Sequence, residues 1–302
     1  MRLPNKDRAR FGAWSEPFKV VNGRKFRLRD YDPGDTLHLE SSDKSRAQEG
    51  LRRGIECLSA LQDRLYAQDR WSVLLIFQAM DAAGKDGAIE HVFSGVNPQG
   101  CQVTSFKAPS SEELDHDYLW RTVRALPERG RIGIFNRSYY EEVLAVRVHR
   151  HYLEAEKLPA PLVTKRIWNE RFEDINAFEK YLSRNGTVIR KFYLHVSRGE
   201  QKRRLIERLD DPAKNWKFSA ADLAERGYWK DYMKAYETCL EETSTRRAPW
   251  YVVPADDKQN ARLIVSAILV GLMRVLDLQY PVVDAVKQKE LRTIRRRLTA
   301  EK

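Results

Sequence analysis

The chain has 302 residues, 42% of them hydrophobic and 32% charged, and 54 Lys and Arg against 43 Asp and Glu give it a net charge of +11. Its size predicts one compact globular chain with room for an appendage, and its three widely spaced cysteines argue against a disulfide framework or a zinc finger. The sequence shows no apolar leader and no run of about 18 uncharged apolar residues, so we expect a cytoplasmic protein that is neither secreted nor membrane-spanning.

The predicted elements begin with an N-terminal extended arm at residues 1–43, in which 26–28 could form a short strand. Apolar residues spaced three and four apart then predict a helix over 44–68. Continuous apolar runs, typical of strands buried on both faces of a parallel sheet, follow at 73–77, 102–106, 132–135, 188–196 and 251–253. Helical patterns occur between them, notably at 111–126, 139–148, 161–182, 220–242 and 258–276.

This alternation predicts a doubly wound α/β domain over 44–280, with a parallel sheet of about five strands and helices on both faces. A basic tail at 281–302 follows, and its segment 287–302 carries seven Lys and Arg against two Glu. That segment is either a solvated or subunit-contacting helix or a contact for a polyanion. The apolar stretch at 263–276 could likewise be core or a contact between subunits.

The most informative segment is the turn after the first buried strand, at residues 78–87. A strand, a turn of small residues and Gly84-Lys85 at a helix start form the context in which backbone N–H groups and the helix N-terminus bind phosphate. Lys85 would place a positive charge on the terminal phosphate. The other residues of the turn expected to bind phosphate are Ala82, Ala83, Gly84, Asp86 and Gly87.

The turn matches the pattern GxxxxGK[ST] incompletely. Ala79 stands at the first glycine position, and Asp86 replaces the hydroxyl residue that normally binds Mg²⁺. A carboxylate, that of Asp81 or Asp86, is a hard oxygen ligand that could hold the metal instead, and we expect Asp81 to do so. The alternative is that Asp81 caps the helix and Lys85 is merely exposed, but a cation at a helix N-terminus is unfavourable without an anion.

A second polar segment, Asn136 to Glu142, follows the strand predicted at 132–135. Polar residues at the carboxyl end of a buried strand lie in the crevice where ligands bind in open α/β sheets. Arg137 could neutralise the charge on a phosphoryl group in transfer, or could form a salt bridge to Glu141 or Glu142. Asn136 stands where P-loop enzymes normally carry an acidic residue.

A basic segment follows the fourth predicted strand and reads as a helix over 197–209. It carries the candidate phosphate-binding residues Arg198, Arg203, Arg204 and Arg208. A segment of this kind in small-molecule kinases closes over the reacting phosphates and excludes water, although a single arginine there can also be solvated. Arg121, directly after Trp120 in the helical pattern at 111–126, could line the opposite wall.

Several of these blocks together resemble the polyphosphate kinase 2 family. They include Asp81-Ala-Ala-Gly-Lys-Asp-Gly87, Val96-Asn-Pro-Gln-Gly100, Asp115-His-Asp-Tyr-Leu-Trp-Arg121, Asn136-Arg-Ser-Tyr-Tyr-Glu141 and Lys191-Phe-Tyr-Leu-His-Val-Ser197. The resemblance covers about residues 20–278. It implies a P-loop kinase fold in which about 198–220 form a helical lid, and a homo-oligomer, dimer or tetramer. It also implies reversible phosphoryl transfer between inorganic polyphosphate and nucleotides with Mg²⁺, or Mn²⁺ in its place.

Within that family, Asn136 and the residues after it resemble the subgroup that phosphorylates both AMP and ADP, and so forms ATP. Other subgroups generally carry Asp at this position, which makes Glu141 a candidate to assist the metal. The expected catalytic residues are therefore Asp81, Lys85, Asn136 and Arg137.

Two other functions remain open on the residues alone. A net charge of +11 indicates a polyanionic partner, which could be nucleic acid, a membrane surface or a phosphate-rich molecule. An ATP-dependent nucleoside monophosphate kinase would share the turn and the lid but would need no long basic groove. A nucleic-acid-binding protein would explain the charge but not Asp81 and Lys85 at a strand-helix junction. We therefore expect polyphosphate and AMP, ADP and ATP as partners, and neither nucleic acid nor a membrane.

Overall fold

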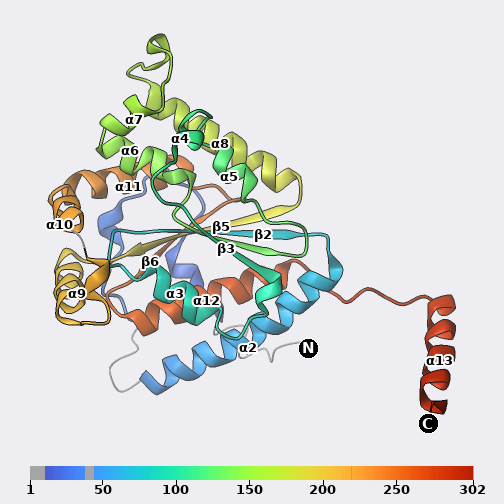
Figure 1. Cartoon of the computed structure of the whole chain (residues 1–302). Coiled ribbons are helices and arrows are strands. Elements are labelled where there is room, and N and C mark those ends of the chain that lie inside the picture. Colours follow the sequence, from blue (N-terminus) through green and yellow to red (C-terminus); the bar gives the residue numbers. More distant parts are fainter. Residues whose placement is uncertain (1–10, 38–43, 219, 302) are drawn as a thin grey trace.

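The protein is described by a computed structural model that covers residues 11–37, 44–218 and 220–301. Parts of the predicted arm (1–10 and 38–43), residue 219 of the predicted lid and the last residue of the tail lie outside this range. A six-stranded sheet forms the centre, in the order β1-β6-β5-β2-β4-β3 (Figure 1). Its strands are β1 (Lys19–Val20), β2 (Ser72–Gln78), β3 (Cys101–Ser105), β4 (Ile132–Asn136), β5 (Thr187–His195) and β6 (Trp250–Pro254).

The sheet confirms the predicted parallel core and corrects its size. The five strands expected from apolar runs, β2 to β6, pair in parallel, and all seven residues of β2 are buried. The sixth strand comes from the N-terminal arm, where Lys19 and Val20 pair antiparallel with β6. The prediction of a strand at 26–28 is wrong, because Leu28 begins a short 3₁₀ helix. The Leu28 N–H donates to Glu237 Oε2 at 3.0 Å.

The strand order places a crevice at the carboxyl end of β2. Chain connections run from β2 to β3 and β4 on one side and then to β5 and β6 on the other. The parallel register sets Asn136 of β4 and Phe192 of β5 on either side of Phe77. Ligands in open α/β sheets bind at such a reversal of strand order, because the connections leave the strand ends uncovered there.

Helices cover both faces of the sheet (Figure 1). One face carries α2 (Lys44–Gln68), α3 (Lys85–Val92) and α12 (Lys258–Val275). The other carries α4 (Ser111–Leu114), α5 (Trp120–Arg124), α6 (Ala145–Val148), α7 (His151–Ala155), α8 (Ile167–Arg184) and α11 (Trp229–Thr243). Beside the strand ends lie α9 (Arg198–Asp210) and α10 (Ala220–Gly227). The stretch at 263–276 is mostly core, since twelve of the eighteen residues of α12 are buried, although Gly271 and Val275 are exposed.

Several long predicted helices are interrupted. The pattern at 111–126 forms α4 and α5, because Asp117 Oδ1 accepts from the Leu119 N–H and bends the chain between them. The pattern at 139–148 begins as the 3₁₀ helix η5 (Tyr139–Val143), and that at 220–242 divides at Tyr228 into α10 and α11. Short-range hydrogen bonds and turns therefore override apolar periodicity at these sites.

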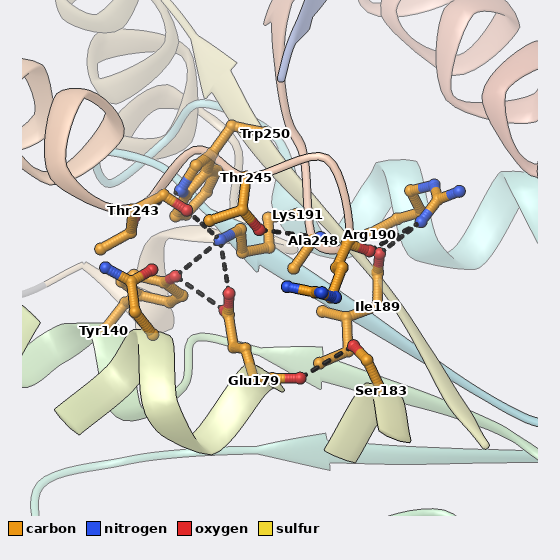
Figure 2. A network of polar contacts seen from close by, with 12 residues as sticks. Tyr140, Glu179, Ser183, Ile189, Arg190, Lys191, Thr243, Thr245, Ala248 and Trp250 are labelled. Carbon is orange, nitrogen blue, oxygen red and sulfur yellow. Dashed lines mark hydrogen bonds and ion pairs between the residues drawn. The ribbon is translucent and has the colours of Figure 1, made fainter. Parts of the chain in front are cut away.

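A buried polar network joins the sheet to the face that carries η5 (Figure 2). Lys191 of β5 donates to Tyr140 Oη at 2.8 Å, Glu179 Oε2 at 2.8 Å and the Thr243 carbonyl at 2.7 Å. The hydroxyls of Tyr139 and Tyr140 donate to Glu179 Oε1. Every hydrogen of the ammonium group has an acceptor, so the network holds η5 against β5 and α8 without leaving a buried charge unpaired.

The two ends of the chain differ. The arm packs on the domain through Phe11, Trp14 and Phe18, which are buried. The tail forms α13 (Ala285–Ala300), whose side chains are exposed and which stands apart from the body (Figure 1). Among the described residues, no helix has the length and apolar content needed to cross a membrane.

Candidate active site

The predicted phosphate-binding turn runs from Ala79 to Gly84, between β2 and α3. Ala82 and Gly84 take left-handed conformations, with φ of 61° and 103°. A left-handed alanine is strained by about 1–2 kcal/mol, so surrounding contacts must hold it. A left-handed turn at a helix N-terminus is the backbone arrangement that presents N–H groups to an anion. The structure therefore forms the turn that the sequence predicts.

Lys85 begins α3, and its amino group folds back onto this turn. Its Nζ donates to the Ala79 carbonyl at 2.8 Å, and the Met80 carbonyl lies 3.5 Å away. Burial lowers the pKa of Lys85, and the nearby carboxylate of Asp81 opposes that shift. A buried cation at a helix N-terminus, bonded to carbonyls only, would be stabilised by a bound anion.

The strand-end residues lie against the turn, as the sequence predicts. Asn136 Nδ2 donates to Asp86 Oδ1 at 2.6 Å, and Arg137 Nη2 donates to Asp81 Oδ1 at 2.9 Å. Arg137 has a left-handed backbone with φ of 63°, a strained conformation that clusters at functional sites. Glu141 raises the pKa of Arg137, which therefore stays charged.

Helix α9 holds the turn from the other side, chiefly through Arg204. Its Nη1 donates to the carbonyls of Ala82 at 3.2 Å and Ala83 at 2.8 Å, and its Nη2 donates to Ala255 at 2.6 Å and Asp256 at 3.0 Å. Its Nε donates to Glu200. All five donors of this buried guanidinium are engaged within the protein, so Arg204 supports the turn.

The other arginines of α9 face different surroundings. Arg208 lines the cavity above the turn. Arg203 is exposed and pairs with Glu200 and Glu207, and Arg198 is exposed at the start of the helix. Arg121 lies beside Phe106, with its Nη1 donating to the Lys107 carbonyl at 2.8 Å. The structure thus gathers Arg121, Arg204 and Arg208 around the site and leaves Arg198 and Arg203 on the outer surface.

A cavity of about 770 Å³ opens over the turn, and we call it the basic cavity. Its cationic lining residues are Lys85, Lys107, Arg137, Arg204, Arg208, Lys214, Lys258 and Arg262. Its acidic lining residues are Asp81, Asp86 and Glu207. The excess of positive charge suits a polyanion.

A second cavity of about 490 Å³ adjoins it, and we call it the aromatic cavity. Its aromatic lining residues include Phe106, Tyr118, Tyr152, Tyr232 and Tyr236. Its acidic lining residues include Glu113, Glu141, Glu142, Glu156 and Glu225. Rings and hydrogen-bond acceptors suit a flat polar molecule such as a nucleoside better than a polyanion.

The two cavities meet at one point. Asp81, Lys107 and Arg137 line both. Cavity size alone would not identify the site, since another cavity of about 500 Å³ lies under the N-terminal arm, beside His195. The turn, the paired Asp81 and Arg137, and the contrast between two linings distinguish the meeting point as the candidate active site.

The donor set at the turn suits Mg²⁺. Within the described ranges, no three or more His, Cys, Asp and Glu side chains gather as a metal site. Mg²⁺ does not need such a cage, because it usually binds one or two carboxylates together with substrate phosphates and water. Asp81 on the turn and Asp86 in the first turn of α3 provide such carboxylates. Glu141 lines the aromatic cavity and not the basic cavity, and its Oε1 accepts a hydrogen bond from Gln78 Nε2 at 2.8 Å.

Sequence reasoning missed several residues of the site. Lys258 and Arg262 line the basic cavity from the start of α12, which follows β6. The signal for them was available, because residues directly after a parallel strand lie at the same sheet edge as the turn. Gln201, which donates to the Asp81 carbonyl at 3.0 Å, follows β5 in the same way, but a neutral amide does not by itself indicate a phosphate site.

A parallel sheet with a phosphate-binding turn after its central strand, an arginine at the next strand end and two adjoining cavities define a P-loop kinase-like phosphotransferase. The family model described as Polyphosphate kinase 2 matches residues 41–280. The chain belongs to the polyphosphate kinase 2 family.

Named relatives and a solved structure agree. The chain is 55% identical over 285 residues to the ADP-polyphosphate phosphotransferase of Rhodopseudomonas palustris, which covers 94% of this chain and 98% of the relative. It is 44% identical over 272 residues to the AMP/ADP-polyphosphate phosphotransferase of Meiothermus ruber, covering 90% and 97%. Polyphosphate Kinase 2 from Arthrobacter aurescens TC1 superposes with a TM-score of 0.83 at 41% identity, covering 92% of this chain and 95% of that one.

Proposed function

We propose that the protein transfers the terminal phosphoryl group of inorganic polyphosphate to ADP and AMP, reversibly and by direct in-line attack. One observation carries this proposal: a strongly basic cavity and an aromatic cavity meet at Asp81 and Arg137. Polyphosphate carries about one negative charge per phosphate, so a cavity lined by eight cations suits it. A single nucleotide would require fewer cations.

The assignment of ligands follows from the linings. Polyphosphate would lie in the basic cavity, with its terminal phosphate on the turn, and the acceptor nucleotide would lie in the aromatic cavity. The attacking phosphate oxygen of the nucleotide then meets the terminal phosphorus of polyphosphate beside Arg137. Phosphoryl transfer needs mainly this alignment and charge neutralisation, and little covalent participation of the protein.

Each residue at the meeting point has a role in this arrangement. The Lys85 ammonium and the N–H groups of the turn would bind the transferred phosphate. Arg137, which already borders both cavities, would neutralise the phosphoryl group as it passes between them. Arg204 would act as a positioning residue, since its donors are engaged by the turn itself. Arg208 would contact the polyphosphate chain.

Asp81, with Asp86 near it, would hold Mg²⁺, which supplies positive charge to the phosphate oxygens when bound. The hydrogen bond from Asn136 orients Asp86 rather than leaving the amide free for a ligand. Asn136 would therefore act by positioning the Asp86 carboxylate at the start of α3.

The test follows ADP and ATP after the purified protein is incubated with polyphosphate and Mg²⁺, with AMP or ADP as acceptor and no added ATP. ATP from both acceptors would support the full proposal. ATP from ADP alone would support the donor and exclude AMP, which would match the name of the Rhodopseudomonas relative. No product with polyphosphate, but ADP formed from AMP and ATP, would favour an ATP-dependent monophosphate kinase.

A further inference from the structure

One glutamine joins α10 to the phosphate-binding turn. Gln201 of α9 is 2% exposed, and its side-chain amide is used at both ends. Its Nε2 donates to the Asp81 carbonyl at 3.0 Å, and its Oε1 accepts from Arg226 Nη1 at 2.7 Å. The same Arg226 nitrogen donates to the Arg198 carbonyl at 2.9 Å. A direct chain of hydrogen bonds therefore runs from α10 to the residue proposed to hold the metal.

The residue before Arg226 faces the aromatic cavity. Glu225 lines that cavity, its Oε2 accepts from the Tyr232 hydroxyl at 2.7 Å, and the same oxygen lies 3.0 Å from His149 Nε2. Glu225 and Arg226 are neighbours on a helix of eight residues. A shift of α10 that changes one of these contacts must also change the other.

The contact at the far end bears on a strained part of the turn. The Asp81 carbonyl precedes Ala82, which has a left-handed backbone. Side chains of α9 bind three successive carbonyls here: Gln201 binds that of Asp81, and Arg204 binds those of Ala82 and Ala83. Arg204 is anchored to the Ala255 and Asp256 carbonyls, whereas Gln201 is anchored to α10. Among the described residues, the Gln201 bond is thus the hydrogen bond that connects α10 to the turn.

We propose that Gln201 and Arg226 are positioning residues that couple the two substrate sites. A nucleotide bound in the aromatic cavity holds α10 in place at Glu225. Arg226, the next residue, then holds the Gln201 side chain through their hydrogen bond. Gln201 in turn holds the Asp81 carbonyl, so that the turn keeps the conformation that binds the terminal phosphate of polyphosphate. This inference rests on the proposed function for the identity of the two ligands. Coupling of this kind is reciprocal, so polyphosphate tightens nucleotide binding by the same factor.

The test measures tripolyphosphate binding by calorimetry, with and without saturating AMP, in EDTA so that no transfer occurs. The unaltered protein is expected to bind tripolyphosphate about five- to tenfold more tightly when AMP is present. Arg226→Ala, which removes a partly exposed side chain, should reduce this ratio to about one. Arg226→Lys should restore part of it, and the matched control Lys230→Ala, an exposed cation nearby, should keep all of it.

A second variant separates the hydrogen bond between Arg226 and Gln201 from the one between Gln201 and the Asp81 carbonyl. Gln201→Glu retains an acceptor for Arg226 but cannot donate to the Asp81 carbonyl. It should therefore lose the AMP effect although α10 stays anchored, and adding Arg226→Ala should cause no further loss. In turnover assays with Mg²⁺, both single variants should raise the KM for polyphosphate at saturating AMP more than they lower kcat.

Two results would overturn the inference. One is a tripolyphosphate affinity that AMP leaves unchanged in the unaltered protein, and the other is an unchanged AMP effect in Arg226→Ala or in folded Gln201→Glu. Failure of the proposed function gives a different result, because it appears as no polyphosphate-dependent product in the presence of Mg²⁺. Urea unfolding of each variant shows whether it is folded when it is measured.

Discussion

Two buried lysines, Lys85 and Lys191, differ in how far the protein satisfies them. Burial lowers the pKa of both. Lys191 pairs with Glu179 at 2.8 Å and has two further acceptors, so its ammonium group has no bonding capacity left (Figure 2). Lys85 has two carbonyl oxygens within 3.5 Å, and it borders the basic cavity.

We infer from this difference that Lys191 is a structural cation and that Lys85 is available to a ligand. A buried charge whose partners are all supplied by the protein serves the fold, because any ligand would have to displace one of them. A buried charge at a cavity with weaker partners is ready for a ligand of opposite charge. Burial alone would not distinguish the two lysines, but the completeness of their bonding does.

The largest expected effect is the loss of turnover in Lys85→Ala. Removing the cation at the turn should lower kcat by about 10³-fold, because the transferred phosphate loses its principal protein charge. The free energy of unfolding should change by less than about 1 kcal/mol, since the ammonium is incompletely paired. Product formation and urea unfolding measure the two effects, and activity within tenfold of the unaltered protein would contradict the role of Lys85.

Lys191→Met should show the opposite pattern. It leaves the Glu179 carboxylate buried without its cation, which costs about 3–5 kcal/mol of unfolding free energy. The second change Glu179→Gln should recover a large part of this loss, because it removes the unpaired charge. Urea unfolding of both single variants and the double variant tests the network, and a loss below about 1 kcal/mol in Lys191→Met would show that Lys191 is not a structural cation.

Substitution of Arg204 should affect both stability and turnover, because all its donors are engaged within the protein and two of them bind the turn. Arg204→Lys retains the charge but cannot reach the same set of carbonyls. We expect a loss of about 2 kcal/mol in stability and a fall of about tenfold in kcat. Lys202→Ala, an exposed cation on the same helix, is the matched control for stability. An Arg204→Lys variant impaired only in polyphosphate binding would instead indicate direct ligand contact.

The smallest expected effect concerns pH and His195. Burial lowers the pKa of His195 to about 4, below its ordinary value of 6.5. Between these values the unfolded chain binds more protons than the folded protein, so stability falls as the pH drops below 6.5. At pH 5.5 the loss relative to pH 8 should be about 1.4 kcal/mol. His195→Asn should remove this part of the pH dependence in urea unfolding, and an unchanged profile would show that other groups cause it.

The sequence predicted those features of the fold and the site that neighbouring residues in the chain determine. The helix predicted over 44–68 has those bounds in the structure, because its apolar spacing matches one buried face. The turn before Lys85 follows from small residues between a buried strand and a helix. The proximity of Asn136 and Arg137 to that turn follows from a general rule, since parallel strands end at the same sheet edge.

Other features depend on how elements pack. Arg203 and Arg204 are adjacent on α9, yet one is exposed and the other is buried against the turn. Sequence reasoning treated them alike, because the rotation of a helix about its axis is set by its neighbours. Lys258 and Arg262 follow a parallel strand, which indicates the sheet edge, but only the packing of α12 turns them toward the basic cavity.

By itself, the sequence determined the five parallel strands, the phosphate-binding turn and the family resemblance, because these depend on residue types within short stretches. The tertiary structure alone decided which cations are available to a ligand. Availability depends on the partners that folding brings within hydrogen-bonding distance, such as Glu179 beside Lys191 and the turn carbonyls beside Arg204. Those partners lie 12 residues away in the first case and 121 in the second, a separation that no local pattern encodes.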